Sequence, residues 1–250
     1  EELHREEQDL GAVDILAIKG LGQFQKFKAA NALRQMVESW HVSDFHISAA
    51  RGAKDALGED GHLSASGDNL QQVARNLFEN HRDVYGKILE AMRQRVPGVS
   101  EISTRDTVDG RLVLQFGNGI FKDPFIDRFV SDGTLKMFAY LVLLHDPSPH
   151  PFLCVEEPEN QLYPRLLPEL AEEFRGYAQR GGQVMVSTHS PDFLNATEVG
   201  EVFWLEKGDD GFSTIRRAAD DAQIVAYMEA GDRMGWLWNQ GLFGKADPRA

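Results

Sequence analysis

The sequence predicts a mixed α/β fold in which a parallel core sheet is flanked by helices. Two apolar runs, residues 152–155 and 183–187, have the composition of buried parallel strands, and a helical stretch at residues 164–178 lies between them. This order favours a parallel sheet, because parallel strands need a long crossover connection. Both strands end in polar residues, which places candidate chemistry at one edge of the sheet.

Composition limits the classes of protein that fit. The chain has 250 residues, of which 42% are hydrophobic and 26% charged, as expected for one substantial globular core. Its longest apolar stretch, residues 137–144, is too short to span a bilayer, so we expect no membrane partner. A single cysteine fits a reducing compartment, and we expect a cytoplasmic location. The net charge of −13 argues against a large nonspecific nucleic-acid footprint, although paired arginines leave a local basic patch open.

The N-terminal half predicts short strands and helices. Residues 13–18 predict a strand, and residues 29–40 a helix, because apolar side chains recur there at helical spacing. A long amphipathic helix is expected over residues 70–92, ended by Pro97-Gly98. Residues 99–105 and 111–116 flank an Asp-Gly pair and predict a hairpin. A second hairpin is expected between residues 201–206 and 212–217.

The start of a helix expected over residues 132–144 is a candidate phosphate-binding feature. Ser131 and Gly133 precede or begin it, and they supply a hydroxyl, free backbone N–H groups and the positive end of the helix dipole. Such a terminus suits a phosphate group. Taken alone, the better interpretation is a helix N-cap with a tight turn.

The strongest chemical signal is the pair Glu156 and Glu157, which follows the strand at residues 152–155. Phosphoryl transfer uses one carboxylate to hold Mg²⁺ through its water shell and another to orient the attacking water. Adjacent residues on a strand point in opposite directions, so the two carboxylates can serve two tasks. The alternative, a solvated acidic turn, would account for this pair about equally well.

The strand at residues 183–187 continues into Thr188-His189-Ser190-Pro191. A neutral His189 beside a terminal phosphate can donate a hydrogen bond and respond to the presence of that phosphate. The alternative is structural, since Ser190 followed by Pro191 is good chemistry for starting a helix.

Together these residues resemble a known family. The order of a Ser-Asp-Gly-Thr helix start, an apolar strand ending in Glu-Glu-Pro-Glu-Asn, and a strand ending in Ser-Thr-His-Ser-Pro is similar to the RecF/SMC-like branch of ABC-type ATPases. Within that branch it is closest to the stand-alone "predicted ATPases" related to the OLD and RecF groups. The resemblance is close over residues 124–195. It implies part of an ABC/RecF-like P-loop NTPase fold with an inserted helical and hairpin segment.

The resemblance also implies roles for individual residues. Residues 131–134 look like the ABC signature, residues 159–163 resemble the D-loop, and the carboxylates occupy the Walker B and catalytic positions. The implied assignments are catalytic Glu157 and His189, a magnesium ligand Glu156, and nucleotide contacts from Ser131, Gly133, Thr134 and Asn160. ATP and Mg²⁺ are the implied cofactors. A homodimer that sandwiches ATP is the implied assembly, coupled to DNA repair, chromosome handling or phage defence through DNA or an effector protein.

Three positions depart from the family pattern. Glu156 stands where relatives carry aspartate, which adds one methylene to the magnesium ligand. Tyr163 stands where many ABC proteins have an aspartate. Asp132 replaces a common glycine, and its carboxylate would repel a γ-phosphate unless it points away.

The largest departure is that the 250 residues contain no G-x-x-x-x-G-K-[ST] phosphate loop. The resemblance places that loop ahead of everything seen here. We therefore expect the chain to be the C-terminal portion of an ATPase and to be inactive alone. The expected organisation is a single ATPase domain over residues 1–250, with a lid-like segment at 48–123, the signature, Walker B and switch core at 124–217, and a helical tail at 218–250.

Two other classes of function stay open. One is a regulatory or dimerisation module that no longer hydrolyses ATP, which the missing phosphate loop would support. The other is a metal-dependent nuclease that uses Glu156, Glu157 and Glu159. A nuclease would need further carboxylate clusters at other strand ends, and the sequence shows none.

Overall fold

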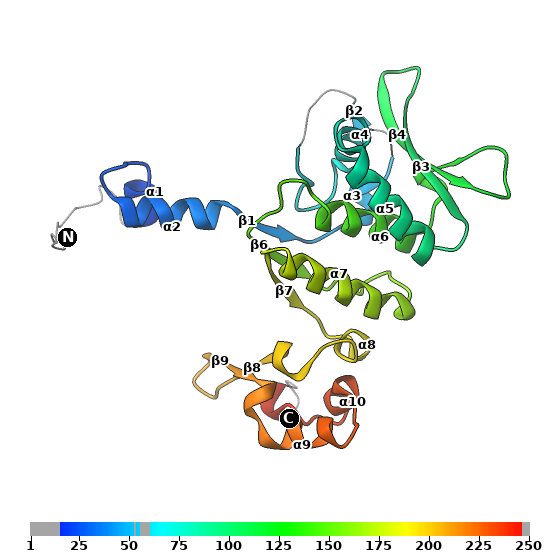
Figure 1. Cartoon of the computed structure of the whole chain (residues 1–250). Helices are drawn as coiled ribbons and strands as arrows, with labels where there is room; N and C mark the ends of the chain where they lie inside the picture. The colour runs from blue at the N-terminus through cyan, green and yellow to red at the C-terminus, as the bar shows by residue number, and fades with distance from the viewer. Residues whose placement is uncertain (1–15, 53, 56–60, 247–250) are drawn as a thin grey trace.

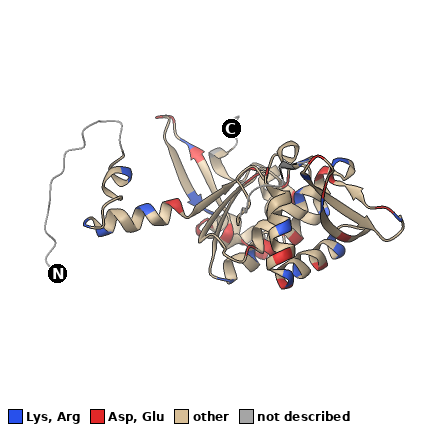
Figure 2. Cartoon of the chain, turned by 90° about the horizontal axis from the view of Figure 1, so that it is seen from above, with Lys and Arg blue, Asp and Glu red and all other residues tan. Residues whose placement is uncertain are grey.

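A computed structural model describes residues 16–52, 54–55 and 61–246 of the chain. It confirms the predicted mixed α/β class, with a parallel sheet flanked by helices and an inserted segment of helices and hairpin strands (Figure 1). Acidic and basic residues are interspersed along the same helices (Figure 2). In the part of the chain that is described, no helix has the length and apolarity that crossing a bilayer requires.

The parallel sheet contains the strands β1 (Trp40–Ser43), β6 (Phe152–Glu156) and β7 (Gln183–Ser187), in the order β1-β6-β7. Both neighbouring pairs are parallel, so the three carboxyl ends lie at one edge. The strands expected at residues 152–155 and 183–187 are confirmed. One face of the sheet remains exposed in the described chain, with Val42 at 56% and Met185 at 60% relative exposure.

The sequence prediction did not include β1. A helix was expected to continue through Trp40, but α2 (Lys28–Glu38) ends at Ser39, whose hydroxyl donates to the carbonyl of Met36 at 2.6 Å. The strand expected at residues 13–18 is wrong where it can be examined, because α1 (Ala17–Leu21) begins there; residues 13–15 lie outside the described chain. Figure 1 shows α1 and α2 extending away from the body, and α2 buries no residue.

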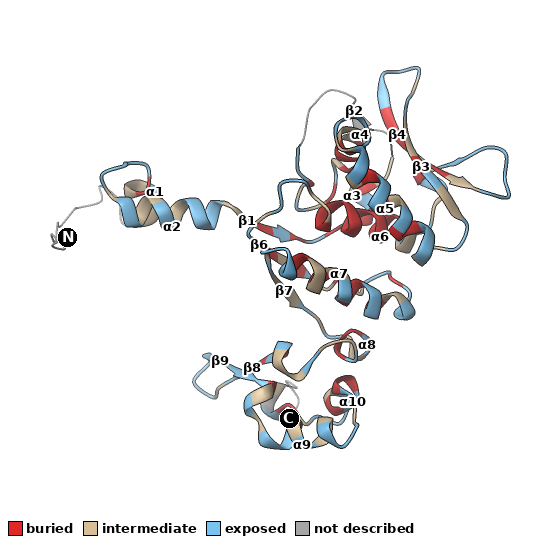
Figure 3. Ribbon diagram, viewed as in Figure 1, coloured by how far each residue is buried: buried red, intermediate tan, exposed pale blue. Residues whose placement is uncertain are grey.

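The helix α6 (Asp132–Leu144) forms the centre of the larger core, as Figure 3 shows. Every position from Leu135 to Leu144 is buried, because the helix contacts α3, α4, α5 and α7. A helix that is apolar on nearly all sides is expected to be enclosed in this way. The prediction of a helix over residues 132–144 is confirmed.

The inserted segment packs beside α6. Its helices are α3 (Ile47–Ala50), α4 (Leu70–Asn80) and α5 (Arg82–Arg95), and its strands are β2 (Lys54–Asp55), β3 (Val99–Asp106), β4 (Arg111–Asn118) and β5 (Phe125–Ile126). The single helix expected at residues 70–92 is interrupted at His81, whose backbone is not helical. The hairpin of β3 and β4 is confirmed, and Gly110 at its turn has a φ of +77° that favours glycine.

The helix α7 (Leu167–Gln179) packs on the main core. The C-terminal side contains α8 (Pro191–Leu194), β8 (Phe203–Lys207), β9 (Ser213–Arg217), α9 (Ala222–Glu229) and α10 (Met234–Asn239). Short 3-10 turns lie at residues 127–129, 164–166, 199–201, 218–220 and 244–246. The hairpin of β8 and β9 confirms the second hairpin prediction. A small hydrophobic cluster separate from the main core holds this end together, with Trp204, Ile224 and Leu237 among its members.

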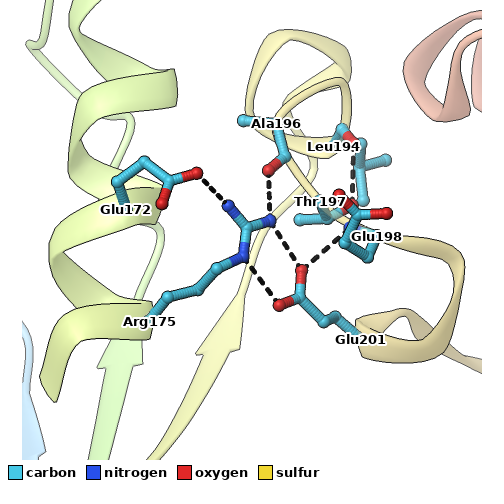
Figure 4. A network of polar contacts seen from close by, with 7 residues as sticks. All are labelled: Glu172, Arg175, Leu194, Ala196, Thr197, Glu198 and Glu201. Atoms are coloured by element: carbon cyan, nitrogen blue, oxygen red, sulfur yellow. Dashed lines mark hydrogen bonds and ion pairs between the residues drawn. The ribbon is translucent and has the colours of Figure 1, made fainter. Parts of the chain in front are cut away.

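Arg175 connects the C-terminal side to the main core (Figure 4). From α7, its guanidinium donates two hydrogen bonds to the carboxylate of Glu201, at 2.8 and 2.7 Å, and one to the carbonyl of Ala196 at 2.5 Å. Glu201 also accepts from the backbone N–H of Glu198 at 2.8 Å. This bidentate pair fixes the segment that leads from β7 to β8.

A group of three histidines lies where β1 and β6 begin. The ring of His150 stacks on that of His41 at 4.6 Å and lies 5.0 Å from that of His62, which pairs with Asp146 at 2.7 Å. Burial and the neighbouring histidines lower the pKa of His41 from 6.5 to about 4, although Asp146 acts in the opposite direction. His41 is therefore neutral in the fold at neutral pH.

This environment predicts a pH-dependent stability. The pKa of His41 is lower in the folded chain than in the unfolded chain, so protonation favours the unfolded state. The free energy of unfolding is therefore highest above pH 6.5 and decreases as the pH falls from 6.5 towards 4. We expect about 2 kcal/mol of the unfolding free energy to be lost through His41 by pH 5. Denaturant unfolding at pH 7.5 and pH 5 should show this loss in the wild type and a smaller one in His41→Phe. Equal losses in both proteins would contradict it, and the exposed His46→Gln serves as the control.

Candidate functional site

A cavity of about 650 Å³ lies at the edge of the parallel sheet where the carboxyl ends of β1 and β6 meet the start of α6. It is lined by side chains from three separate segments of the sequence, residues 44–51, 132–136 and 156–161. These residues are Asp44, Phe45, His46, Ile47, Ser48, Arg51, Asp132, Lys136, Glu156, Glu157, Asn160 and Gln161. The signature-like segment and the acidic pair therefore share one cavity.

Glu156 and Glu157 both line this cavity. Glu156 is the last residue of β6 and is exposed. The backbone of Glu157 has a φ of +36°, a region that side chains other than glycine rarely adopt and that costs on the order of 1–3 kcal/mol. The alternation expected for strand residues therefore stops after Glu156, and the two carboxylates face the same space. The carboxylate of Glu157 accepts a hydrogen bond from the side-chain amide of Asn160 at 3.1 Å.

The structure brings His189 to Glu157. The imidazole Nε2 of His189 lies 3.6 Å from a carboxylate oxygen of Glu157, and the histidine side chain is 79% exposed. The turn that carries His189 is held by Glu159, which accepts from the hydroxyl of Thr188 at 2.6 Å and from the backbone N–H of His189 at 3.2 Å. Ser190 caps α8, so the structural interpretation of the Ser190-Pro191 pair also applies.

The start of α6 packs against the turn that follows Glu157. The hydroxyl of Ser131 accepts from the backbone N–H of Thr134 at 3.2 Å, as an N-cap residue does. A Cβ on Gly133 would lie 2.8 Å from the carbonyl oxygen of Gln161, which is too close for any larger residue without a backbone shift. Gly133 therefore has a packing reason that the sequence did not reveal. Ser131 remains exposed.

Arg51 neutralises the carboxylate of Asp132. Its guanidinium forms an ion pair with Asp132 and donates to the carbonyls of Asp127 and Val130 at 2.6 and 2.7 Å. The repulsion expected between Asp132 and a phosphate is offset by this arginine. All three bonds hold the loop before α6 in place, so Arg51 also positions the helix start.

The sequence interpretation missed Asp44 and Lys136. Asp44 follows the overlooked strand β1 and pairs with His46 at 3.2 Å. The sequence 40–43 alternates in polarity and is followed by a carboxylate, a signal that could have identified both the strand and the residue. Lys136 lies in the second turn of α6 and is only 3% exposed. A lysine within an otherwise apolar helical run is unusual, and this pattern could have identified Lys136 as a candidate site residue.

The residues present fit a magnesium–nucleotide complex by their chemistry. Among the described residues, no three or more of the types His, Cys, Asp and Glu are grouped so as to hold a metal ion by themselves. Mg²⁺ does not need such a group, because in nucleotide sites it keeps several waters and uses one or two carboxylates together with substrate phosphates. Glu156 and Glu157 supply carboxylates at the cavity, and Asn160 supplies an amide.

Comparisons with known proteins give one family match and several similar solved structures. A family model described as "AAA domain, putative AbiEii toxin, Type IV TA system" matches residues 18–195. No curated protein sequence matches the chain. The similar solved structures include an SMC ATPase studied for ATP-driven dimerization and DNA-stimulated activation, which is 16% identical with a TM-score of 0.43 over 64% of this chain and 98% of that one.

Two further structures are Smc heads. One, bound to the C-winged helix domain of ScpA, is 14% identical with a TM-score of 0.43 and covers 58% of this chain and 48% of that one. The other, with an extended coiled coil bound to the C-terminal domain of ScpA, derives from Pyrococcus furiosus. It is 12% identical with a TM-score of 0.44 and covers 85% of this chain and 50% of that one. The chain thus spans about half the length of each Smc head structure.

Proposed function

The chain belongs to the AAA domain family whose model spans residues 18–195, and on this premise we propose that its cavity is a site of ATP binding and hydrolysis. One observation carries the proposal. Glu156 and Glu157 line one cavity, and His189 lies 3.6 Å from Glu157. Paired carboxylates and a histidine are groups that phosphoryl transfer uses.

Each residue has a defined role in this proposal. Glu156 would hold Mg²⁺ through the water shell of the ion, and Mg²⁺ would neutralise the charge on the phosphates. Glu157 accepts a hydrogen bond from the attacking water and orients it, while Asn160 holds the Glu157 carboxylate in place. His189 donates a hydrogen bond to the terminal phosphate and is exposed enough to reach it.

We further propose that two copies sandwich the nucleotide. The start of α6, with Ser131, Gly133 and Thr134, would then direct its free N–H groups at a phosphate held by the other copy. Ser131 is exposed, which this arrangement requires. The work coupled to hydrolysis would be DNA repair, chromosome handling or phage defence. Because the family description names a toxin–antitoxin system, the effector protein would be the other member of such a pair.

A test of the site needs a protein that can turn over ATP. The 250 residues contain no G-x-x-x-x-G-K-[ST] sequence. The test protein therefore joins the 250 residues to a segment that carries a glycine-rich phosphate loop, and we call it the loop-bearing protein. In it, Glu156→Gln should raise the Mg²⁺ concentration for half-maximal turnover on the order of tenfold or more, because the charged metal ligand is lost. A phosphate-release assay over a range of Mg²⁺ concentrations measures this.

The matched control is Glu229→Gln, which changes an exposed carboxylate at the end of α9. It should leave the magnesium dependence unchanged. An unchanged dependence in Glu156→Gln would remove Glu156 from the metal site.

A second candidate function is a module that dimerises without hydrolysing ATP. The observation that favours it is the absence of the phosphate loop from the 250 residues. The two candidates differ in one result, because only the hydrolytic site predicts that turnover in the loop-bearing protein depends on Glu157.

A further inference from the structure

Lys136 is a buried cation at the wall of the cavity. It lies in the second turn of α6, is 3% exposed, and lines the cavity beside Glu156 and Glu157. Removing an ammonium group from water is unfavourable unless the group is paired and hydrogen-bonded. A lysine kept in this position therefore needs an explanation from its contacts.

Those contacts leave the ammonium without an acceptor. Within the described residues, Lys136 forms no hydrogen bond and no ion pair, and its Nζ lies 5.7 Å from the centre of the Tyr140 ring. Burial lowers the pKa of Lys136, and the more distant carboxylates of Glu159, Asp44 and Glu157 oppose this effect. No carboxylate of the described residues lies close enough to Nζ to form an ion pair with it.

The other cation of the cavity shows the contrast. Arg51 is bound to Asp132 and to two backbone carbonyls, so its donors are directed at the protein itself. The three N–H donors of the Lys136 ammonium make no hydrogen bond to the described residues. Of the two cations, it is the one available to a ligand in the cavity.

Among the described residues, two polar atoms of side chains near Lys136 are buried and have no hydrogen-bond partner. They are the hydroxyl of Tyr140 and the second carboxylate oxygen of Glu159, whose first oxygen is bound by Thr188 and the N–H of His189. Burial, and then Glu159 and Asp44, raise the pKa of Tyr140, so its hydroxyl keeps its proton and can donate. Buried polar groups without partners are uncommon, and several together indicate a place that a polar ligand or ordered water completes.

We propose that Lys136 binds an oxygen of the terminal phosphate of the Mg²⁺–nucleotide, from the same copy that supplies Glu156 and Glu157. The inference rests on the proposed function and adds a phosphate contact to that site. A phosphate has the charge and the acceptor atoms that the ammonium lacks, and lysine binds phosphate as a point charge. Because carboxylates also line the cavity, the phosphate binds together with a divalent cation that offsets their repulsion.

A different role for Lys136 would be to neutralise the acidic groups and stabilise the fold. The two roles predict opposite effects of Lys136→Met, which keeps the length of the side chain and removes its charge. If Lys136 stabilises the fold, this change lowers the unfolding temperature. If Lys136 is kept for a ligand, the change removes an unpaired buried charge, and the unfolding temperature stays the same or rises.

The experiment titrates magnesium pyrophosphate into the 250-residue chain and follows it by ³¹P NMR, with thermal unfolding measured on the same samples. We expect millimolar binding that requires Mg²⁺, and a loss of at least about tenfold in Lys136→Met, the scale of one charge-assisted hydrogen bond. The unfolding temperature should not fall. The matched control is Lys87→Met, which changes an exposed lysine on α5 and should leave binding unchanged.

Three results would overturn the inference. They are binding by Lys136→Met within about twofold of wild type, a lowered unfolding temperature in that variant, and no pyrophosphate binding by the wild type. Turnover in the loop-bearing protein then separates this failure from failure of the proposed function. If Glu157→Gln abolishes turnover while Lys136→Met preserves it, only the inference about Lys136 is wrong. If Glu157→Gln preserves turnover, the hydrolytic site itself is wrong.

Discussion

Replacing Glu157 with glutamine is expected to stop ATP turnover in the loop-bearing protein while ATP binding stays intact. The amide keeps the shape of the side chain and its contact with Asn160, but it loses the negative charge that orients the attacking water. A group in this role contributes about 10²–10⁴-fold to the rate. A phosphate-release assay and a nucleotide-binding titration on the same preparation measure the two quantities separately.

The backbone of Glu157 makes this variant informative. Its φ of +36° is set by the turn and by the hydrogen bond from its N–H to the carbonyl of Ser187 at 3.0 Å, neither of which involves the side chain. Glutamine should therefore leave the fold unchanged. Turnover within about threefold of wild type, which is less than one kcal/mol of barrier, would show that Glu157 is not the catalytic carboxylate.

The second large effect is expected at Ser131. Ser131→Arg places a long cationic side chain at the exposed start of α6, where the dimer proposal brings the phosphate of the other copy. The variant should bind ATP as a single copy and lose both ATP-dependent dimerisation and turnover. Static light scattering and the phosphate-release assay report the two losses.

Ser131→Ala is the control for Ser131→Arg, because it removes the N-cap hydrogen bond to Thr134 without adding bulk. It should cost about 1 kcal/mol of stability and leave dimerisation in place. If the alanine and arginine variants lose dimerisation equally, the helix cap and not a contact across the dimer explains the effect.

Mixing variants tests whether the site is shared between two copies. Ser131→Arg is combined with a loop-bearing protein that lacks the phosphate-loop lysine, so that one composite site carries both defects and the other carries neither. Some hydrolysis should return in the mixture. If both variants are inactive alone and the mixture stays inactive, the active site does not form across two copies in the way proposed.

Local sequence patterns predicted most of the core. The apolar runs at residues 152–155 and 183–187 became β6 and β7, and the serine-capped apolar run became α6. These elements are bounded by strong local signals, a cap or a polar turn. The strand β1 was missed because Trp40 continues the helical spacing of α2, and only the cap at Ser39 breaks it. A helix and a short strand in sequence are hard to separate by periodicity alone.

The sequence named candidate site residues by type, but it did not predict how they are arranged. Glu157 and His189 were expected from motif order, and the structure places them 3.6 Å apart. The pairing of Arg51 with Asp132 spans most of the inserted segment, and no local pattern encodes it. Lys136 was hidden within an apolar helix, because its burial and lack of a partner depend on how β1 and the turn after β6 meet around it.

We propose that ATP held between two copies is hydrolysed by a water that Glu157 orients, and the molar mass of the Glu157→Gln loop-bearing protein tests both parts of this proposal at once. Blocking hydrolysis while preserving binding should trap the sandwich. Light scattering should therefore give the mass of two copies with Mg²⁺–ATP and of one copy without nucleotide, and the double variant with Ser131→Arg should stay at one copy. A single-copy mass for Glu157→Gln at saturating Mg²⁺–ATP would contradict a nucleotide sandwich between two copies.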